Sequence, residues 1–147
     1  MSARSDSVLK IIASFALVLW AGATWTAGYI FAPILFHAYG REQAAEIAGR
    51  LFHAVNLIGL FAAMVILLDY RVRFSKTLQH QSGLWVLLLV LFSVIVQYIG
   101  LTPMMESAKI SGDIARFGLL HGVSQVVYLL QSLGLAYLIY DKFHARS

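Results

Sequence analysis

Residues 84–101 read LWVLLLVLFSVIVQYIGL, an apolar run that contains no charged side chain. As an α-helix, a run of this length crosses most of a hydrocarbon core about 30 Å thick. The whole chain is 60% hydrophobic and 12% charged, whereas soluble domains carry about 25% charged residues. The protein is therefore expected to reside in a membrane.

Three further apolar stretches have comparable length, and each is bounded by charged or turn residues. Backbone N–H and C=O groups find no water in hydrocarbon, so each stretch must be helical unless the chain closes into a barrel. No alternation of apolar and polar residues supports a barrel. We predict an all-α polytopic membrane protein, a four-transmembrane-helix bundle that forms one domain over residues 1–147. The predicted spans are 11–36, 51–68, 84–101 and 117–140.

The basic residues stand at the ends of the apolar stretches rather than in one cluster, so nucleic acid is not an expected partner and the lipid bilayer is. An even number of spans places both termini and the loop 70–81 on one side of the membrane. Positive charge is more frequent on that side, which predicts cytoplasmic termini. The counts are seven on that side, Arg4, Lys10, Arg71, Arg73, Lys76, Lys142 and Arg146, against four on the other, Arg41, Arg50, Lys109 and Arg116.

The chain contains no cysteine, which excludes disulfides, thiolate metal sites and cysteine nucleophiles. It also contains no P-loop, dinucleotide-binding, G-x-S-x-G or H-E-x-x-H motif. No catalytic motif therefore supports an enzyme.

The two halves of the chain resemble each other. Residues 29–33 (YIFAP) correspond to 98–103 (YIGLTP), and residues 51–56 (LFHAVN) correspond to 119–124 (LLHGVS). If the match reflects a duplication, each half is a hairpin of two helices in the same orientation. The prolines of the first pair are expected to end or bend their helices.

The repeat places His53 and His121 at one depth, near the outer ends of the second and fourth spans. Each histidine belongs to a stripe of polar residues at helical spacing. Because a polar face against lipid costs free energy, both stripes are expected to turn inward and to line a polar pocket in the outer half of the bundle. The expected ligand-binding residues are His53, His121, Arg50, Arg116, Asn56, Ser124, Gln125, Gln97 and Glu106.

Several interpretations of the two histidines stay open. They can form an interhelical hydrogen-bond network, or they can be the axial ligands of a haem b. A divalent metal is a further alternative, with Glu106 or His37 completing its shell. The remaining alternatives are a proton relay and the binding of an anionic substrate that the neighbouring arginines attract.

Small residues mark faces on which helices can approach closely. Gly118 and Gly122 form a G-x-x-x-G in the fourth span, and Thr24 and Gly28 form a similar pair in the first. These pairs serve packing within the bundle, or contact with a second copy of the chain or another membrane protein.

Three short segments carry a resemblance to a known family. They are Trp25-x-x-Gly28-Tyr29-x-x-x-Pro33-x-x-Phe36, Ala48-Gly49-Arg50-Leu51-Phe52 and Phe117-x-x-Leu120-His121-Gly122-x-Ser124. Together they resemble the transmembrane-protein-205-like domain family, also catalogued as domain of unknown function 4149, of small four-span bacterial membrane proteins. The resemblance implies a bacterial cytoplasmic (inner) membrane protein without an established activity, and it supplies no catalytic residues.

The hairpin arrangement is also similar to a wider group of four-helix membrane proteins that includes haem-binding protoporphyrinogen oxidases and copper-resistance membrane domains. This similarity implies haem. The present chain nevertheless has no histidine within its first span, and residues 33–36 read PILF where the oxidase branch has Pro-Arg-Leu-Phe. Oxidase activity is therefore not expected.

Two functions follow from these observations. The first is a non-enzymatic integral membrane protein whose polar pocket binds a ligand, passes a small solute or docks a partner. The second is a haem-binding redox protein that acts on a porphyrin or quinone, with His53 and His121 as axial ligands.

The charge bias predicts the orientation of the chain. A reporter that is active only in the periplasm should work when fused after Glu106 and should fail when fused at Phe74 or at the C-terminus. Reporter activity in a bacterial host measures this, and the opposite pattern would overturn the predicted orientation.

Overall fold

A computed structural model describes residues 3–144 of the chain, with side chains from Ser7 onward. Arg146 and the side chain of Arg4, which enter the charge count above, lie outside the described residues. The described part has four helices that are long and apolar enough to cross a membrane, and it contains no strand. The chain is therefore an all-α, multi-pass integral membrane protein. The four spans are Ser7–Ala38, Arg41–Arg73, Ser82–Ile110 and Ile114–His144.

Each span contains the corresponding predicted apolar stretch and extends beyond it, because polar residues at the interface continue the helix. Two spans are unbroken α-helices, and the other two each contain a π-helical segment between two α-helical ones. In chain order the elements are α1 (Ala3–Trp25), η1 (Thr26–Phe31), α2 (Ala32–Ala38), α3 (Arg41–Arg73), η2 (Leu78–His80), α4 (Ser82–Ile95), η3 (Val96–Leu101), α5 (Thr102–Ile110) and α6 (Ile114–His144).

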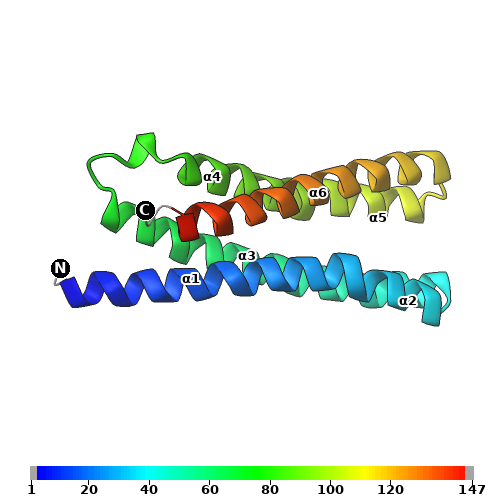
Figure 1. Ribbon diagram of the computed structural model, residues 1–147. Coiled ribbons are helices and arrows are strands. Elements are labelled where there is room, and N and C mark those ends of the chain that lie inside the picture. Colours follow the sequence, from blue (N-terminus) through cyan, green and yellow to red (C-terminus); the bar gives the residue numbers. More distant parts are fainter. Residues whose placement is uncertain (1–2, 145–147) are drawn as a thin grey trace.

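The four spans form two helical hairpins that pack side by side (Figure 1). α1 packs mainly against α3, α4 packs mainly against α6, and α1 also contacts α6 while α3 contacts α4. Both ends of the chain and the connection between α3 and α4 lie at one end of the bundle, which we call the terminal end (Figure 1). The turns before α3 and before α6 lie at the opposite end, which corresponds to the predicted outer half.

The two π segments occupy equivalent places in the two hairpins, which supports the internal repeat. η1 directly precedes the segment that contains Pro33, and η3 directly precedes the one that contains Pro103. A proline has no N–H and its ring clashes with the carbonyl four residues earlier, so it disrupts a regular helix. Neither proline ends its helix. The prolines instead coincide with a change from α to π hydrogen bonding, such as the N–H of Thr102 donating to the carbonyl of Gln97.

The turn between α5 and α6 follows from two residues. Gly112 has a φ of 70°, a left-handed conformation that glycine adopts without steric cost. Asp113 then caps α6, because its Oδ1 accepts the backbone N–H of Arg116 at 3.0 Å. This short turn forces α6 to run antiparallel to α5.

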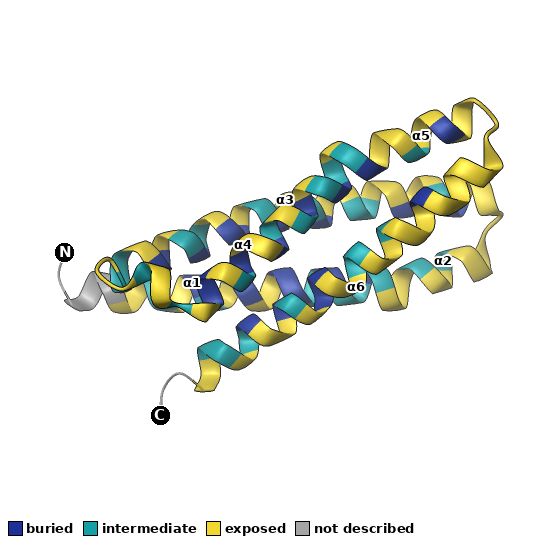
Figure 2. Cartoon of the chain, turned by 90° about the horizontal axis from the view of Figure 1, so that it is seen from above, coloured by how far each residue is buried: buried dark blue, intermediate teal, exposed yellow. Residues whose placement is uncertain are grey.

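The largest apolar cluster lies between α1, α3, α4 and α6 in the half of the bundle toward the terminal end (Figure 2). Trp20 lies at the limit of this cluster farther from the terminal end and is fully buried. It packs directly against the backbone of Gly59 in α3, where a Cβ would collide with the indole ring. Toward the opposite end α6 is mostly exposed, and of residues 114–123 only Leu120 is buried. The bundle is therefore packed tightly at one end and loosely at the other.

The two small-residue pairs differ in use. Gly28 packs within the chain, because a Cβ there would collide with the ring of Tyr128 in α6. At Gly118 and Gly122 a Cβ would meet no atom within 4 Å. The first pair therefore serves packing inside the bundle, whereas the second pair lies on an open face of α6.

We expect Gly59→Ala to destabilise the protein by about 1–3 kcal/mol, because the added methyl group overpacks the contact with Trp20. The matched control is Gly22→Ala, where a Cβ meets open space and the gain in helix propensity is about 0.5–1 kcal/mol. Unfolding followed by circular dichroism in mild detergent measures both. Equal stability of the two variants would contradict this account of the α1–α3 contact.

Candidate functional site

Several interior polar side chains lie on one face of α6 near the middle of this membrane-spanning helix. Ser124, Tyr128, Gln131 and Ser132 follow the spacing i, i+4, i+7 and i+8, and each is buried or half-buried. We call these residues the α6 polar face. Through hydrogen bonds this face reaches both π segments, so it connects the two hairpins.

The Tyr128 hydroxyl enters the backbone of the first span just before its π segment. It donates a hydrogen bond to the carbonyl oxygen of Thr24, and it also interacts with the backbone of Gly28. In a regular α-helix the N–H of Gly28 would itself donate to that carbonyl. The side chain is thus inserted into the hydrogen-bond ladder, a recognised cause of local helix distortion.

A second contact fixes the same π segment on α6. The hydroxyl of Tyr29 donates to Oγ of Ser132 at 3.0 Å, and Ser132 donates to the carbonyl of Tyr128 at 2.9 Å. The rings of Tyr29 and Tyr128 pack edge to face with centroids 6.0 Å apart, and Phe52 of α3 packs similarly on Tyr128. Three helices therefore meet around one tyrosine.

The other π segment makes a reciprocal contact with α6. The Gln97 side chain donates through Nε2 to the carbonyl of Ser124 and accepts the Ser124 hydroxyl through Oε1, both at 2.8 Å. The hydroxyl of Thr102 donates to the Gln97 carbonyl at 2.8 Å. Gln97 and Ser124 were predicted site residues, and the structure brings these two together.

Three polar atoms next to this network are buried and have no hydrogen-bond partner. They are Nε1 of Trp20, Oγ1 of Thr24 and Nε2 of Gln131, and the three residues are at most 2% exposed. An unsatisfied buried polar group costs about 1–3 kcal/mol, and hydrocarbon supplies no water to relieve it. These three atoms are the buried side-chain atoms without a hydrogen-bond partner among the described residues.

The nine predicted ligand-binding residues differ in burial. Gln97 is buried, and Asn56 and Ser124 are half-buried, but the other six predicted residues are exposed. For those six, ligand binding stays a prediction. They are Arg50, His53, Glu106, Arg116, His121 and Gln125.

The two histidines engage different neighbours. The His53 ring lies 5.3 Å from the ring of Tyr98 between centroids. His121 stacks on Phe117 of its own helix at 5.9 Å, and its Nε2 is 3.1 Å from Nε2 of Gln125. The spans have 29–33 residues, more than the roughly 20 that cross a hydrocarbon core, so headgroups and water can solvate polar side chains near the helix ends without a pocket.

No group of three or more His, Asp or Glu side chains that could hold a metal ion occurs among the residues that the structure describes. Haem or metal binding by His53 and His121 stays a prediction.

A network of charged side chains closes the terminal end between α3 and α6. The Asp69 carboxylate is fully buried and accepts two hydrogen bonds from Arg73, one of them from Nε at 2.7 Å. Nζ of Lys142 lies 3.3 Å from the same carboxylate. Next to it the Tyr70 hydroxyl lies 3.5 Å from Oδ2 of Asp141. A buried carboxylate needs such partners because its desolvation is otherwise prohibitive.

The sequence analysis did not indicate four residues of these sites, which are Trp20, Thr24, Gln131 and Asp69. Thr24 was considered there only as a small residue for packing. A signal existed for two of them. Gln131 interrupts the run LLQSL and Asp69 interrupts LLDY, and a polar or acidic residue within a membrane span is a functional candidate by default. The missing hydrogen bonds of Trp20 and Thr24 depend on neighbours from other helices and had no local signal.

Comparison with known protein families matches residues 15–113 to a family described as a domain of unknown function, DUF4149. No curated protein and no solved structure matches the chain.

We expect Tyr128→Phe to lower the stability of the protein by about 1–3 kcal/mol, because the Thr24 carbonyl loses its side-chain donor inside the membrane. Tyr140→Phe is the control, since Tyr140 is exposed and only its ring contacts a neighbour, His144. Chemical unfolding in detergent measures the difference. If both variants unfold at the wild-type midpoint, the inserted hydroxyl does not hold the first π segment.

Proposed function

This chain belongs to the DUF4149 family, and we propose that it is a membrane-embedded binding protein for a small, neutral molecule that accepts hydrogen bonds. The observation that carries the proposal is the set of three buried, partnerless polar atoms on Trp20, Thr24 and Gln131. Each one lowers the stability of the ligand-free protein, and a bound molecule would supply the missing partners.

The three groups lie within about one helical turn of each other in depth. Trp20 and Thr24 are one turn apart on the same face of α1. Gln131 is one turn from Tyr128 on α6, and the Tyr128 hydroxyl is bonded to the Thr24 backbone. α1 and α6 run in opposite directions. One turn back along α1 from Thr24 to Trp20, and about one turn forward along α6 from Tyr128 to Gln131, both lead toward the terminal end. Trp20 and Gln131 therefore lie at a similar depth. We call Trp20, Thr24 and Gln131 the orphan layer.

The chemistry of the orphan layer selects the class of ligand. The indole N–H of Trp20 and the amide NH₂ of Gln131 only donate, and the Thr24 hydroxyl can donate or accept. An anion would satisfy donors, but it would be costly at this depth because no cation lies in the layer. A neutral carbonyl or ether oxygen meets the donors without that cost. The proposed ligand is therefore an uncharged molecule of this kind that dissolves in lipid.

The surroundings favour entry from the end opposite the termini, or sideways from the lipid there. Toward the terminal end the next layer contains Ile66, Leu87 and Leu135, which are at most 1% exposed. Beyond it stands the buried Asp69 network. Toward the other end α6 packs loosely, and its exposed polar side chains supply a hydrated approach. With cytoplasmic termini, as the charge bias predicts, this is the periplasmic side of a bacterial cytoplasmic membrane.

The proposal concerns binding rather than catalysis, because the three groups of the orphan layer are neutral and none titrates near neutral pH. No observation on the described residues favours the haem alternative, in which His53 and His121 would have to approach a common centre.

Two apolar substitutions of similar size test the proposal. In protein washed free of bound molecules, Thr24→Val and Gln131→Leu should each raise stability by about 1 kcal/mol or more, because each removes an unsatisfied polar group. In protein isolated gently from membranes, native mass spectrometry should detect a bound small molecule on the wild type and none on the double variant.

Ser132→Ala is the matched control. Ser132 is buried on the same helix next to Gln131, but its hydroxyl is hydrogen-bonded to Tyr29 and to the Tyr128 carbonyl, so this variant should be less stable than the wild type. If Thr24→Val and Gln131→Leu destabilise the washed protein as Ser132→Ala does, the orphan groups are structural and the binding proposal is wrong.

A further inference from the structure

The face of α6 that turns away from the bundle carries a row of exposed residues along most of the helix (Figure 2). At about 100° per residue these residues lie within a stripe about 80° wide. The buried residues Leu120 and Leu135 lie on the opposite side of the helix. We call this row the α6 seam, and it consists of Ile114, Gly118, Gly122, Gln125, Leu129 and Ala136.

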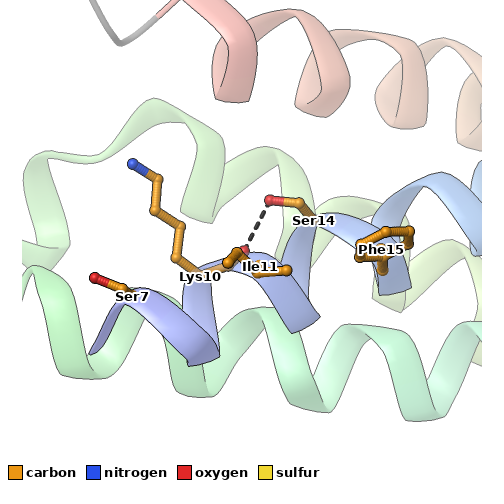
Figure 3. Close-up of a pocket in the computed structure, with 5 residues that line it drawn as sticks. All are labelled: Ser7, Lys10, Ile11, Ser14 and Phe15. Carbon is orange, nitrogen blue, oxygen red and sulfur yellow. Dashed lines mark hydrogen bonds between the residues drawn. The ribbon is translucent and has the colours of Figure 1, made fainter. Parts of the chain in front are cut away.

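An ordinary lipid-facing surface occurs on α1, where an open hollow is lined by residues of that helix (Figure 3). Ser7 and Lys10 lie nearest the end of the helix, and Ile11 and Phe15 lie further in. The polar side chain further in, that of Ser14, donates to the carbonyl of Lys10 at 2.8 Å. Polar groups at the membrane surface and apolar groups inside it match the two regions of a bilayer, so lipid is sufficient to cover this surface.

The α6 seam has the reverse pattern. α6 has 31 residues and is about 46 Å long, so a centred helix extends about 8 Å beyond each side of a hydrocarbon core about 30 Å thick. Gln125 lies about 16 Å along the helix from Ile114 and is therefore inside the core. Ile114 is the first residue of α6, lies outside the core and is 85% exposed. An amide thus faces hydrocarbon, and an apolar side chain faces headgroups and water.

The Gln125 amide has unused capacity for hydrogen bonds. Its Nε2 lies 3.1 Å from Nε2 of His121 on the same helix, a contact that engages at most one of its two N–H groups. Its Oε1 has no hydrogen-bond partner among the described residues. Lipid tails supply neither a donor nor an acceptor, whereas glutamine side chains hydrogen-bond across neighbouring membrane helices. The amide therefore calls for a polar partner on another helix.

Two glycines allow such a helix to approach. A Cβ at Gly118 or at Gly122 would meet no atom of this chain within 4 Å, so the backbone of α6 is open there. Small residues with this spacing let two membrane helices come close together. Gly122 is three residues before Gln125 and on the same face, so a helix that packs on the glycines also comes within reach of the amide.

A second copy of the chain fits the α6 seam, because identical chains share one orientation in the membrane. A two-fold axis along the membrane normal brings each seam residue beside the same residue of the other copy at equal depth. A glutamine amide both donates and accepts, so the two Gln125 side chains can satisfy each other. The same axis lets the two Ile114 side chains cover each other outside the core. The seam contains no charged residue that would repel its copy.

We propose that the protein forms a parallel homodimer through the α6 seam, in which Gly118 and Gly122 allow close approach and Gln125 pairs with Gln125 of the second copy. The interface uses the face of α6 that points away from the bundle, so it does not depend on ligand binding at the orphan layer.

Cross-linking of introduced cysteines tests the interface directly, because the chain has no cysteine of its own. Leu129 and Leu130 are adjacent and both exposed, but only Leu129 lies in the α6 seam. The full chain is purified and reconstituted at low density in phosphatidylcholine vesicles, then treated with a short thiol-to-thiol cross-linker. Leu129→Cys should give at least about tenfold more cross-linked dimer than Leu130→Cys, because facing helices rotate Leu130 away by about 100°. Equal yields would indicate random collision and overturn the proposal.

Single-molecule photobleaching in the same vesicles measures dimerisation of the variants. Gln125→Leu should weaken dimerisation about tenfold, the effect of losing a reciprocal pair of hydrogen bonds between membrane helices, and Gln125→Asn should weaken it less. Gly122→Ile should leave mainly monomers. Gly49→Ile is the matched control, because Gly49 is an exposed glycine of α3 with equally open space, and it should dimerise as the wild type does.

Wild-type protein that stays monomeric at every density would overturn the second copy as the occupant of the α6 seam, including the case in which the seam cross-links to a different membrane protein in cells. Wild-type dimerisation in both Gln125→Leu and Gly122→Ile would place the contact elsewhere and overturn the interface. If Gly122→Ile does not fold, Gln125→Leu and the Leu129→Cys and Leu130→Cys pair decide the question.

Discussion

The structure depends on one constraint, which is that every backbone N–H and C=O inside the hydrocarbon must find a partner within the protein. Four apolar helices meet most of this requirement on their own. The prolines at positions 33 and 103 disturb it, because each removes a backbone donor within a span. The change from α to π hydrogen bonding before each proline rearranges the backbone hydrogen bonds of the helix, and side chains of α6 supply further hydrogen bonds. Tyr128 binds the Thr24 carbonyl, and Gln97 and Ser124 bind each other.

This arrangement explains why the polar residues of α6 face inward at mid-membrane. Tyr128, Ser132 and Ser124 each have a partner in the other spans, so their desolvation is offset by hydrogen bonds. Gln131 occupies the same face and has no partner for its Nε2. The α6 polar face thus satisfies its other interior polar groups and leaves this one without a partner among the described residues, as is also true of Nε1 of Trp20 and Oγ1 of Thr24 on α1.

The bundle also differs from end to end. At the terminal end a large apolar cluster and the buried Asp69 network hold α3 and α6 together. At the opposite end α6 is largely exposed, and the loops are short. The bundle is therefore packed tightly at the terminal end and loosely at the other.

The amino-acid sequence by itself determined the all-helical class, the four spans and the resemblance between the two hairpins, and all three are present in the structure. These features follow from hydropathy and from the local effect of proline, both of which act within one segment of chain. The sequence also indicated Gln97 and Ser124 as residues of one interior polar site, and the structure brings their side chains together. The direction of His53 and His121 could not be read in this way, because a stripe shows which residues share a face and not whether that face meets another helix, lipid or headgroups. The partnerless state of Trp20, Thr24 and Gln131 was decided only by the tertiary structure, since a hydrogen bond within a bundle requires a second group from a distant segment at the same depth.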